Sequence, residues 1–233
     1  MTSRNRRNRR FVVAAVLAAL LLPVRAGFSQ MSPADEEFRY RWQLRNFVGS
    51  IAGLFLPNQG EGELTFKRQN GQLKSELLIT SSASKNGEYF RYGSMMDVST
   101  LQPIRAWSAY SWRGESKQKT SEIETEGVLD VASGIYAIRS DPPTATRRME
   151  IWSDGKVYPV VVIPLGSDRR KIGTRNAKVD TRRYSIRGID VPGRRKWKGK
   201  LDLWLAKDEA ATPVEILISR NLADVHLELL SPP

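Results

Sequence analysis

Alternation of apolar and polar residues with a period of two is the feature that most constrains the fold. Phe38, Tyr40, Trp42 and Leu44 alternate with polar residues, which places four large apolar side chains on one face of a strand. Further segments of this kind are separated by turn residues and lie at 62–81, 89–98, 104–113, 117–126, 157–165, 182–189, 201–206, 214–219 and 225–230. The pattern predicts a mainly β fold with a strongly curved antiparallel sheet of roughly ten strands.

Some of these segments carry more specific signals. Asn70-Gly71 is the dipeptide that most readily supplies the two positive φ angles of a type I′ turn, so 62–81 is predicted to be a hairpin. Segment 157–165 has apolar residues on both faces, and Trp204 and Leu217 add bulk to faces that are otherwise polar. We therefore expect apolar cover on both sides of these strands.

Residues 130–139 are the one segment that favours a helix. Asp130 can cap its N-terminus, and Val131, Ile135 and Ile138 form an apolar stripe along one side. A single helix among many strands suits a half-barrel in which the helix packs on the concave side of the sheet. Such an arrangement leaves a groove between helix and sheet unless side chains fill it.

The sequence VLDVASGIYAIR at 128–139 resembles the Asp-x-x-Ser-x-x-Tyr-x-x-Arg element of a family catalogued as domain of unknown function 3108. Segments 201–208 and 212–214 resemble the apolar-Trp-apolar strand, acidic turn and Pro-Val strand of the same family. The resemblance implies an exported, β-rich bacterial envelope protein with a half-barrel similar to that of lipoprotein carriers. It implies no established activity. Gly134 departs from the family, which favours a better helix former at this position.

The N-terminus has the layout of a secretory signal peptide. Five arginines in the first ten residues precede the apolar run 11–22, and small residues follow near position 26. The alternative is a membrane anchor, but twelve apolar residues fall short of the roughly 20 that span a bilayer. We therefore expect cleavage of 1–26, a single β-rich domain at 27–233, and export to the periplasm or the medium.

The chain contains no cysteine, which excludes disulfides, thiolate metal sites and a lipid-modified cysteine. Its net charge of +12 is concentrated at the leader and between positions 169 and 200, where thirteen basic residues accompany two acidic ones. The candidates for contact with an anionic envelope surface are Arg169, Arg170, Lys171, Arg182, Arg183, Arg194, Arg195, Lys196 and Lys198. The alternative is a set of solvated strand faces and loops, and export argues against a nucleic-acid partner.

Signatures of catalysis are few. His226 is the only histidine and is predicted to face outward from its strand, so a histidine-rich metal site or a triad would need other groups. The sequence SASK at 82–85 lacks the companion motifs of penicillin-binding enzymes. Asp202, Asp208 and Glu209 could supply a hydrolytic carboxylate pair, although turn chemistry explains them better. We expect no cofactor, no metal and no enzymatic activity.

The aromatic residues of the predicted strands and helix could line the hollow side of the sheet and contact an acyl chain or a sugar ring. The groove candidates are Trp42, Trp107, Trp112, Trp204 and Tyr136. The hypothesis is an envelope protein that binds a lipid, an amphiphile or a hydrophobic partner in this groove. The alternatives are an envelope assembly or polysaccharide-associated structural protein and, third, a cryptic carboxylate hydrolase. A hollow of several hundred cubic ångströms would favour the carrier, whereas a packed interior would favour the structural protein.

Overall fold

A computed structural model describes residues 35–45, 59–82, 87–112, 114–173, 177–220 and 223–231 of the 233-residue chain. The expected signal peptide and three of the four residues at 82–85 lie outside these ranges. No helix among the described residues is both long enough and apolar enough to span a lipid bilayer.

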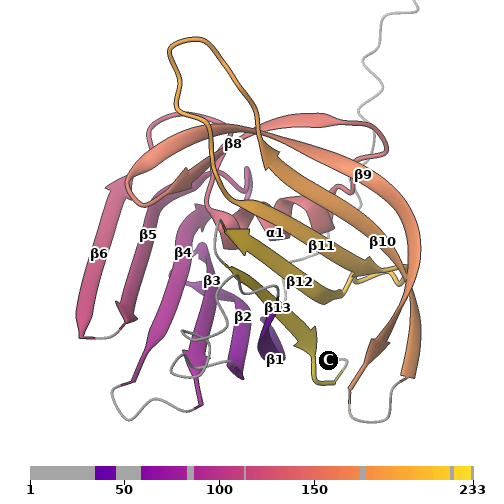
Figure 1. The fold of residues 1–233 in the computed structure, drawn as a ribbon. Helices are drawn as coiled ribbons and strands as arrows, with labels where there is room; N and C mark the ends of the chain where they lie inside the picture. Colours follow the sequence, from indigo (N-terminus) through magenta and orange to yellow (C-terminus); the bar gives the residue numbers. More distant parts are fainter. Residues whose placement is uncertain are drawn as a thin grey trace, which may run out of the picture. The chain divides into compact units, whose positions relative to one another are not determined.

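Within these ranges the chain forms one helix and one large sheet (Figure 1). The strands are β1 (Glu36–Arg45), β2 (Gln59–Gln69), β3 (Gln72–Ser81), β4 (Tyr89–Asp97), β5 (Pro103–Trp112), β6 (Glu115–Glu122), β7 (Val128–Leu129), β8 (Arg147–Ser153), β9 (Lys156–Ile172), β10 (Ala177–Gly188), β11 (Lys200–Ala206), β12 (Pro213–Arg220) and β13 (Ala223–Leu229). Their order in the sheet is β6-β5-β4-β3-β2-β1-β13-β12-β11-β10-β9-β8-β7. The predicted mainly β, antiparallel class is confirmed, with thirteen strands and a single parallel pair, β7 with β8.

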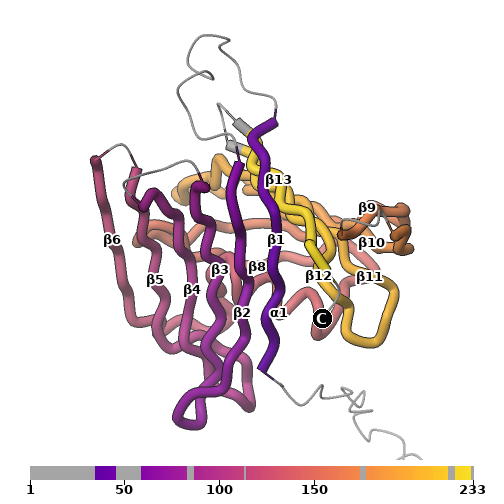
Figure 2. The backbone as a smooth tube through the Cα atoms, turned by 90° about the horizontal axis from the view of Figure 1, so that it is seen from below, coloured from indigo at the N-terminus to yellow at the C-terminus, as the bar shows by residue number. Residues whose placement is uncertain are grey.

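The sheet curves around α1 (Val131–Ser140), and its concave face holds the core (Figures 1 and 2). Phe38, Tyr40 and Trp42 of β1 are buried on this face, as the alternation predicted. Trp42 is in register with Leu227 of β13 and with Gly60 of β2. Because directly opposed residues of antiparallel strands share a face, the register assigns every strand residue to the concave or the convex side.

The two margins of the sheet meet through side chains. β6 and β7 are the edge strands, so no ladder of backbone hydrogen bonds closes the sheet. Ser108 of β5 donates a hydrogen bond of 2.9 Å to Asp154 in the β8–β9 turn. Beside it, Ala106, Val128 and Trp152 form a small buried apolar cluster. The result is a half-barrel whose open side is covered by packing of β5 against β8.

The hairpin predicted at Asn70-Gly71 is confirmed. Asn70 has a φ of 52° and Gly71 a φ of 76°, the left-handed pair that a type I′ turn requires. β6 lies at the edge of the sheet, and its side chains are almost all exposed. Polar residues suit this position because an apolar edge strand would invite pairing with another chain.

β9 does not have the two-sided cover that its sequence predicts. Val160 and Val162 are buried on the concave side, whereas Val161 and Ile163 on the convex side are only half-buried and Leu165 is 43% exposed. The expectation of full burial was wrong here because the helix covers the concave face alone.

The helix is confirmed with its predicted cap. The Asp130 carboxylate accepts hydrogen bonds from the backbone N–H groups of Ala132 (2.8 Å) and Ser133 (3.3 Å), while the Ser133 hydroxyl accepts one from the Asp130 N–H. This capping box satisfies donors that the first helical turn leaves without partners. Burial raises the pKa of Asp130, although these hydrogen bonds oppose the rise.

Arg139 anchors the other end of the helix to the sheet. It is 4% exposed, and its guanidinium donates two hydrogen bonds of 2.9 Å to the Glu36 carboxylate. It also donates to the backbone carbonyls of Ala210 (2.8 Å) and Ala211 (3.1 Å). A buried charge is tolerated only when it is paired and hydrogen-bonded in this way. The pairing holds the C-terminal end of α1 against β1 on the concave face.

Candidate functional site

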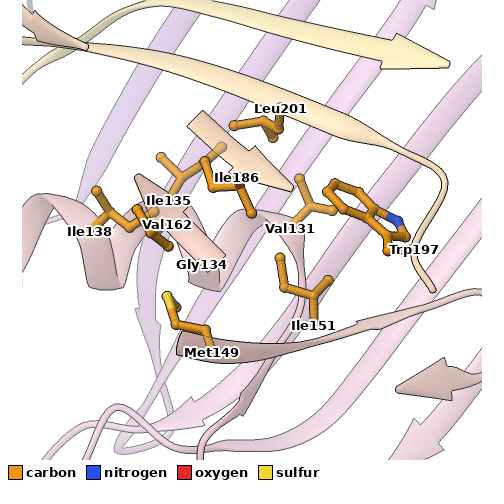
Figure 3. A pocket seen from close by; sticks show the side chains of 10 residues that line it. All are labelled: Val131, Gly134, Ile135, Ile138, Met149, Ile151, Val162, Ile186, Trp197 and Leu201. Atoms are coloured by element: carbon orange, nitrogen blue, oxygen red, sulfur yellow. The ribbon is translucent and has the colours of Figure 1, made fainter. Parts of the chain in front are cut away.

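A small apolar pocket lies between α1 and the sheet (Figure 3). α1 contributes Val131, Gly134, Ile135 and Ile138, whose spacing of three and four residues puts them on one side of the helix. Aliphatic residues of β8, β9, β10 and β11 form the opposite walls, and Trp197 lies at the end away from Ile138 (Figure 3). None of the residues lining the pocket is charged, so the pocket suits an apolar group.

Gly134 contributes to the empty space of the pocket. A Cβ atom placed on Gly134 would meet no atom within 4 Å, so the missing side chain leaves a vacancy in the helix–sheet contact. The empty volume is about 310 Å³, which includes space open to solvent, but the centre of a water molecule can reach only about 10 Å³ of it. That is room for roughly one water molecule and not for an acyl chain. The groove expected from the sequence is therefore almost filled by side chains.

Trp197 is the one wall of the pocket that belongs to neither α1 nor a strand. It lies in the segment 189–199, which connects β10 to β11 and which we call the β10–β11 loop. Two glycines let the loop fold closely on itself: a Cβ on Gly188 would lie 2.2 Å from the Trp197 carbonyl oxygen, and one on Gly199 would lie 2.7 Å from the indole ring. The half-buried Trp197 thus closes one end of the pocket from a segment outside the sheet.

Trp42, Trp112 and Tyr136, three of the five groove candidates, lie on the concave side, but none of them lines this pocket. Trp42 is buried, and its Nε1–H donates to the Thr80 carbonyl at 2.7 Å. Tyr136 packs against the Phe66 ring, with centroids 4.8 Å apart. Trp112 is half-buried. Trp42 and Tyr136 are core residues of the half-barrel.

Trp107 and Trp204 lie on the convex face, which corrects their assignment to the groove. Trp107 lies over Gly93 and donates from its Nε1–H to Glu76 at 3.3 Å. Trp204 is buried with the guanidinium groups of Arg170 and Arg183 at 4.4 and 4.8 Å from its ring. The expected apolar cover on this face is replaced by cations that stack on the indole.

The nine basic candidates form two groups and not one surface. One group lies on the β9–β10 hairpin and comprises Arg169, Arg170, Lys171, Arg182 and Arg183. Three of its members form ion pairs: Arg169 with Asp180 (2.9 Å), Arg170 with Asp168 (2.6 Å) and Glu215 (3.4 Å), and Arg183 with Asp202 (2.7 Å). The second group comprises Arg194, Arg195, Lys196 and Lys198 and lies in the β10–β11 loop. Only this second group adjoins the apolar pocket.

The polar residues singled out for chemistry have structural partners. Asp202 has no exposed side-chain surface and accepts hydrogen bonds from Ser185 (2.5 Å) and Arg183 (2.7 Å), with Lys200 at 2.8 Å. Burial alone would raise the pKa of Asp202, but these three donors outweigh burial and lower it. Such a carboxylate is an ion-pair partner and a poor general acid.

His226 lies on the convex face as predicted, yet it is only 3% exposed because it contacts Glu215. Asp208 accepts the backbone N–H of Thr212 at 3.1 Å, the turn role that its sequence context favours. Within the described ranges no group of three or more His, Cys, Asp or Glu residues could hold a metal ion.

Trp197 is the site residue that sequence reasoning missed. In the sequence it stands only as an aromatic residue within a basic segment, where charge dominates the interpretation. The available signal was the sequence GRRKWKG at 193–199, in which one large apolar residue stands between cations and is followed by a glycine. An isolated tryptophan in such a loop needs an apolar surface to cover.

Comparison with known proteins places the chain by sequence and by fold. The family model described as "Protein of unknown function (DUF3108)" matches residues 39–229. A search of curated proteins finds no match. Among solved structures, a β-barrel-like protein of domain of unknown function DUF1849 from Brucella abortus has a TM-score of 0.54 at 8% identity and covers 85% of this chain and 97% of its own. The Mycobacterium tuberculosis lipoprotein LppX has a TM-score of 0.29 at 12% identity and covers 84% of this chain and 87% of its own. Only the first score is high enough to support a shared fold.

Proposed function

The chain belongs to the DUF3108 family, and we propose that it is an exported, non-enzymatic envelope protein that binds the apolar tail of a lipid or other amphiphile in the pocket beneath α1. The observation that carries the proposal is the wholly apolar lining of this pocket, closed at one end by Trp197. The signal-peptide pattern at 1–26 supports export.

Binding requires that Trp197 leave its place. The pocket at rest accepts about one water molecule, so a tail enters only as the indole moves out and vacates its volume. The other walls belong to the helix and to paired strands, whereas connecting loops move at lower cost. Each methylene group that then leaves water contributes about 0.8 kcal/mol, which offsets the exposure of the indole once several are buried.

Substitutions at Gly134 test the proposal. Leucine at this position would place its side chain in the vacancy, so Gly134→Leu is expected to abolish binding of a fluorescent fatty acid. Gly134→Ala is the matched control, because its single methyl group takes up much less of the space that a tail needs than a leucine side chain does, so this variant should retain most of the binding. Trp197→Ala is expected to accelerate uptake of the fatty acid in stopped-flow fluorescence, since it removes the wall that must move.

Native mass spectrometry of the protein purified from the envelope supplies the independent measurement. The proposal predicts a co-purifying lipid-sized mass in wild-type protein that is lost in Gly134→Leu. Wild-type protein that is consistently empty and does not bind fluorescent fatty acids would refute it. Equal binding by wild type and Gly134→Leu would place any ligand outside this pocket.

The second candidate is an envelope assembly or polysaccharide-associated structural protein. The near-complete filling of the helix–sheet interface favours it, because a scaffold needs no interior space. It predicts that affinity purification from membranes recovers a stable partner and that Gly134→Leu leaves this recovery unchanged. A partner that is lost when the pocket is filled would point back to ligand binding.

A further inference from the structure

We infer that the β10–β11 loop recognises an anionic head group, with Arg195 and Lys198 as its contact residues. This inference rests on the proposed function, because the head group would belong to the amphiphile whose tail enters beside Trp197. The ligand would carry a carboxylate, phosphate or sulfate group, which are the anions that guanidinium and ammonium groups bind.

Two of the four cations of the β10–β11 loop form ion pairs that hold the loop in place. Arg194 forms an ion pair of 3.0 Å with Glu150 of β8, the strand that also supplies Met149 and Ile151 to the pocket. Lys196 forms an ion pair of 2.7 Å with Asp190 within the loop. Glu150 and Asp190, the acidic partners in these two pairs, are therefore each already paired with a cation.

Arg195 and Lys198 have a different environment. Both are exposed, and neither has an ion-pair partner among the residues that the structure describes. Chain connectivity keeps the Cα of Lys198 about 3.8 Å, and that of Arg195 at most about 7.6 Å, from the Cα of Trp197. Two exposed positive charges without an ion-pair partner among the described residues therefore lie within two residues of Trp197 in the chain, the residue that closes the apolar pocket. An apolar site with exposed cations close to the residue that closes it would suit both the tail and the head group of an anionic amphiphile.

The other cations of the basic segment lack this combination. On the β9–β10 hairpin, Arg170 and Arg183 stack on Trp204 and pair with acidic residues. Lys171 and Lys178 are exposed and directly opposed in the β9–β10 ladder, but neither they nor their neighbours line the pocket. They carry the same charge as Arg195 and Lys198 without an apolar site beside them, which makes them a matched control.

The experiment measures binding of three twelve-carbon probes below their micelle concentration: laurate, dodecyl phosphate and dodecanol. Affinities come from displacement of a fluorescent fatty acid at low ionic strength, for wild type, Arg195→Gln/Lys198→Gln and the control Lys171→Gln/Lys178→Gln. Each lost cation is expected to weaken binding of the anionic probes roughly fivefold, so the loop variant loses roughly 25-fold. Dodecanol should bind the loop variant and the wild type equally, and the control should match wild type throughout.

Added salt should weaken anionic binding to wild type and reduce the difference from the loop variant. A stronger loss for dodecyl phosphate than for laurate assigns a phospholipid-type head, and the reverse assigns a fatty acid. The inference is overturned if wild type binds dodecanol as tightly as laurate, or if both double variants lose laurate equally. Binding of none of the three probes would overturn the proposed function together with it, whereas dodecanol binding without head-group preference overturns the inference alone.

Discussion

Replacement of Gly134 by alanine should stabilise the protein, although Gly134 is buried in the centre of the molecule. It occupies the fourth position of α1, and its N–H donates to the Asp130 carbonyl at 2.8 Å, so its backbone is helical. A Cβ at this position would have no neighbour within 4 Å. The substitution therefore adds a methyl group to empty space without a clash.

Two terms set the magnitude. Alanine is about 0.8–1.0 kcal/mol better than glycine inside a helix, because glycine loses more backbone entropy on folding. Burial of one methyl group adds up to about 0.8 kcal/mol. The free energy of unfolding should therefore rise by about 1–2 kcal/mol. For a domain of this size, that corresponds to an increase in Tm of roughly 3–6 °C.

Urea unfolding followed by tryptophan fluorescence measures the change, and Gly71→Ala provides the matched control. A Cβ on Gly71 would also meet open space, but the φ of 76° at this residue is left-handed, so alanine there should cost about 1 kcal/mol. The same chemical change is thus expected to have opposite signs at the two positions. If Gly71→Ala is destabilised but Gly134→Ala is no more stable than wild type, the reasoning is refuted. That result would show that the space beside Gly134 cannot accept a methyl group.

Other side chains give further predictions. Arg139→Leu should lower the free energy of unfolding by about 3–5 kcal/mol in urea titrations, because it removes the hydrogen-bond donor of the partly buried Glu36 carboxylate and of two backbone carbonyls. Asp202→Asn should lower the free energy of unfolding by about 1–3 kcal/mol in the same assay, since Lys200 and Arg183 both lose a buried counter-charge. Hydrogen bonds from neighbouring hydroxyl and amide groups lower the pKa of Asp97 to about 2. The stability that Asp97 contributes relative to Asp97→Asn should therefore be complete above about pH 4 and lost as pH falls through about 2.

Local patterns predicted the elements of the fold well. The alternation in β1, the Asn70-Gly71 turn and the Asp130 cap depend on residues close together in sequence, and the structure has all three. Their signals are strong because one or two side chains determine the backbone conformation. The curvature of the sheet and the position of the helix followed from these elements, since a lone helix must cover the concave face of the strands.

Cover on the convex face could not be predicted in the same way. The sequence shows Trp204 as an apolar residue on a polar face, and it shows Arg170 as one cation in a basic segment. Only the fold brings the guanidinium to 4.4 Å from the indole. A contact between distant strands leaves no periodic signal, so the sequence favoured an apolar covering layer where the protein uses a cation.

The same non-local packing decides what the basic segment can do. From the sequence alone, the thirteen basic residues between positions 169 and 200 are equally good candidates for binding an anion. In the structure, cations such as Arg183 are held by carboxylates and an indole ring, so an external anion would have to compete with partners already in place. Arg195 and Lys198 face no such competition from the described residues. Binding of an anion therefore depends on which cations the fold leaves without a partner beside an apolar site, and a count of charges along the chain cannot identify them.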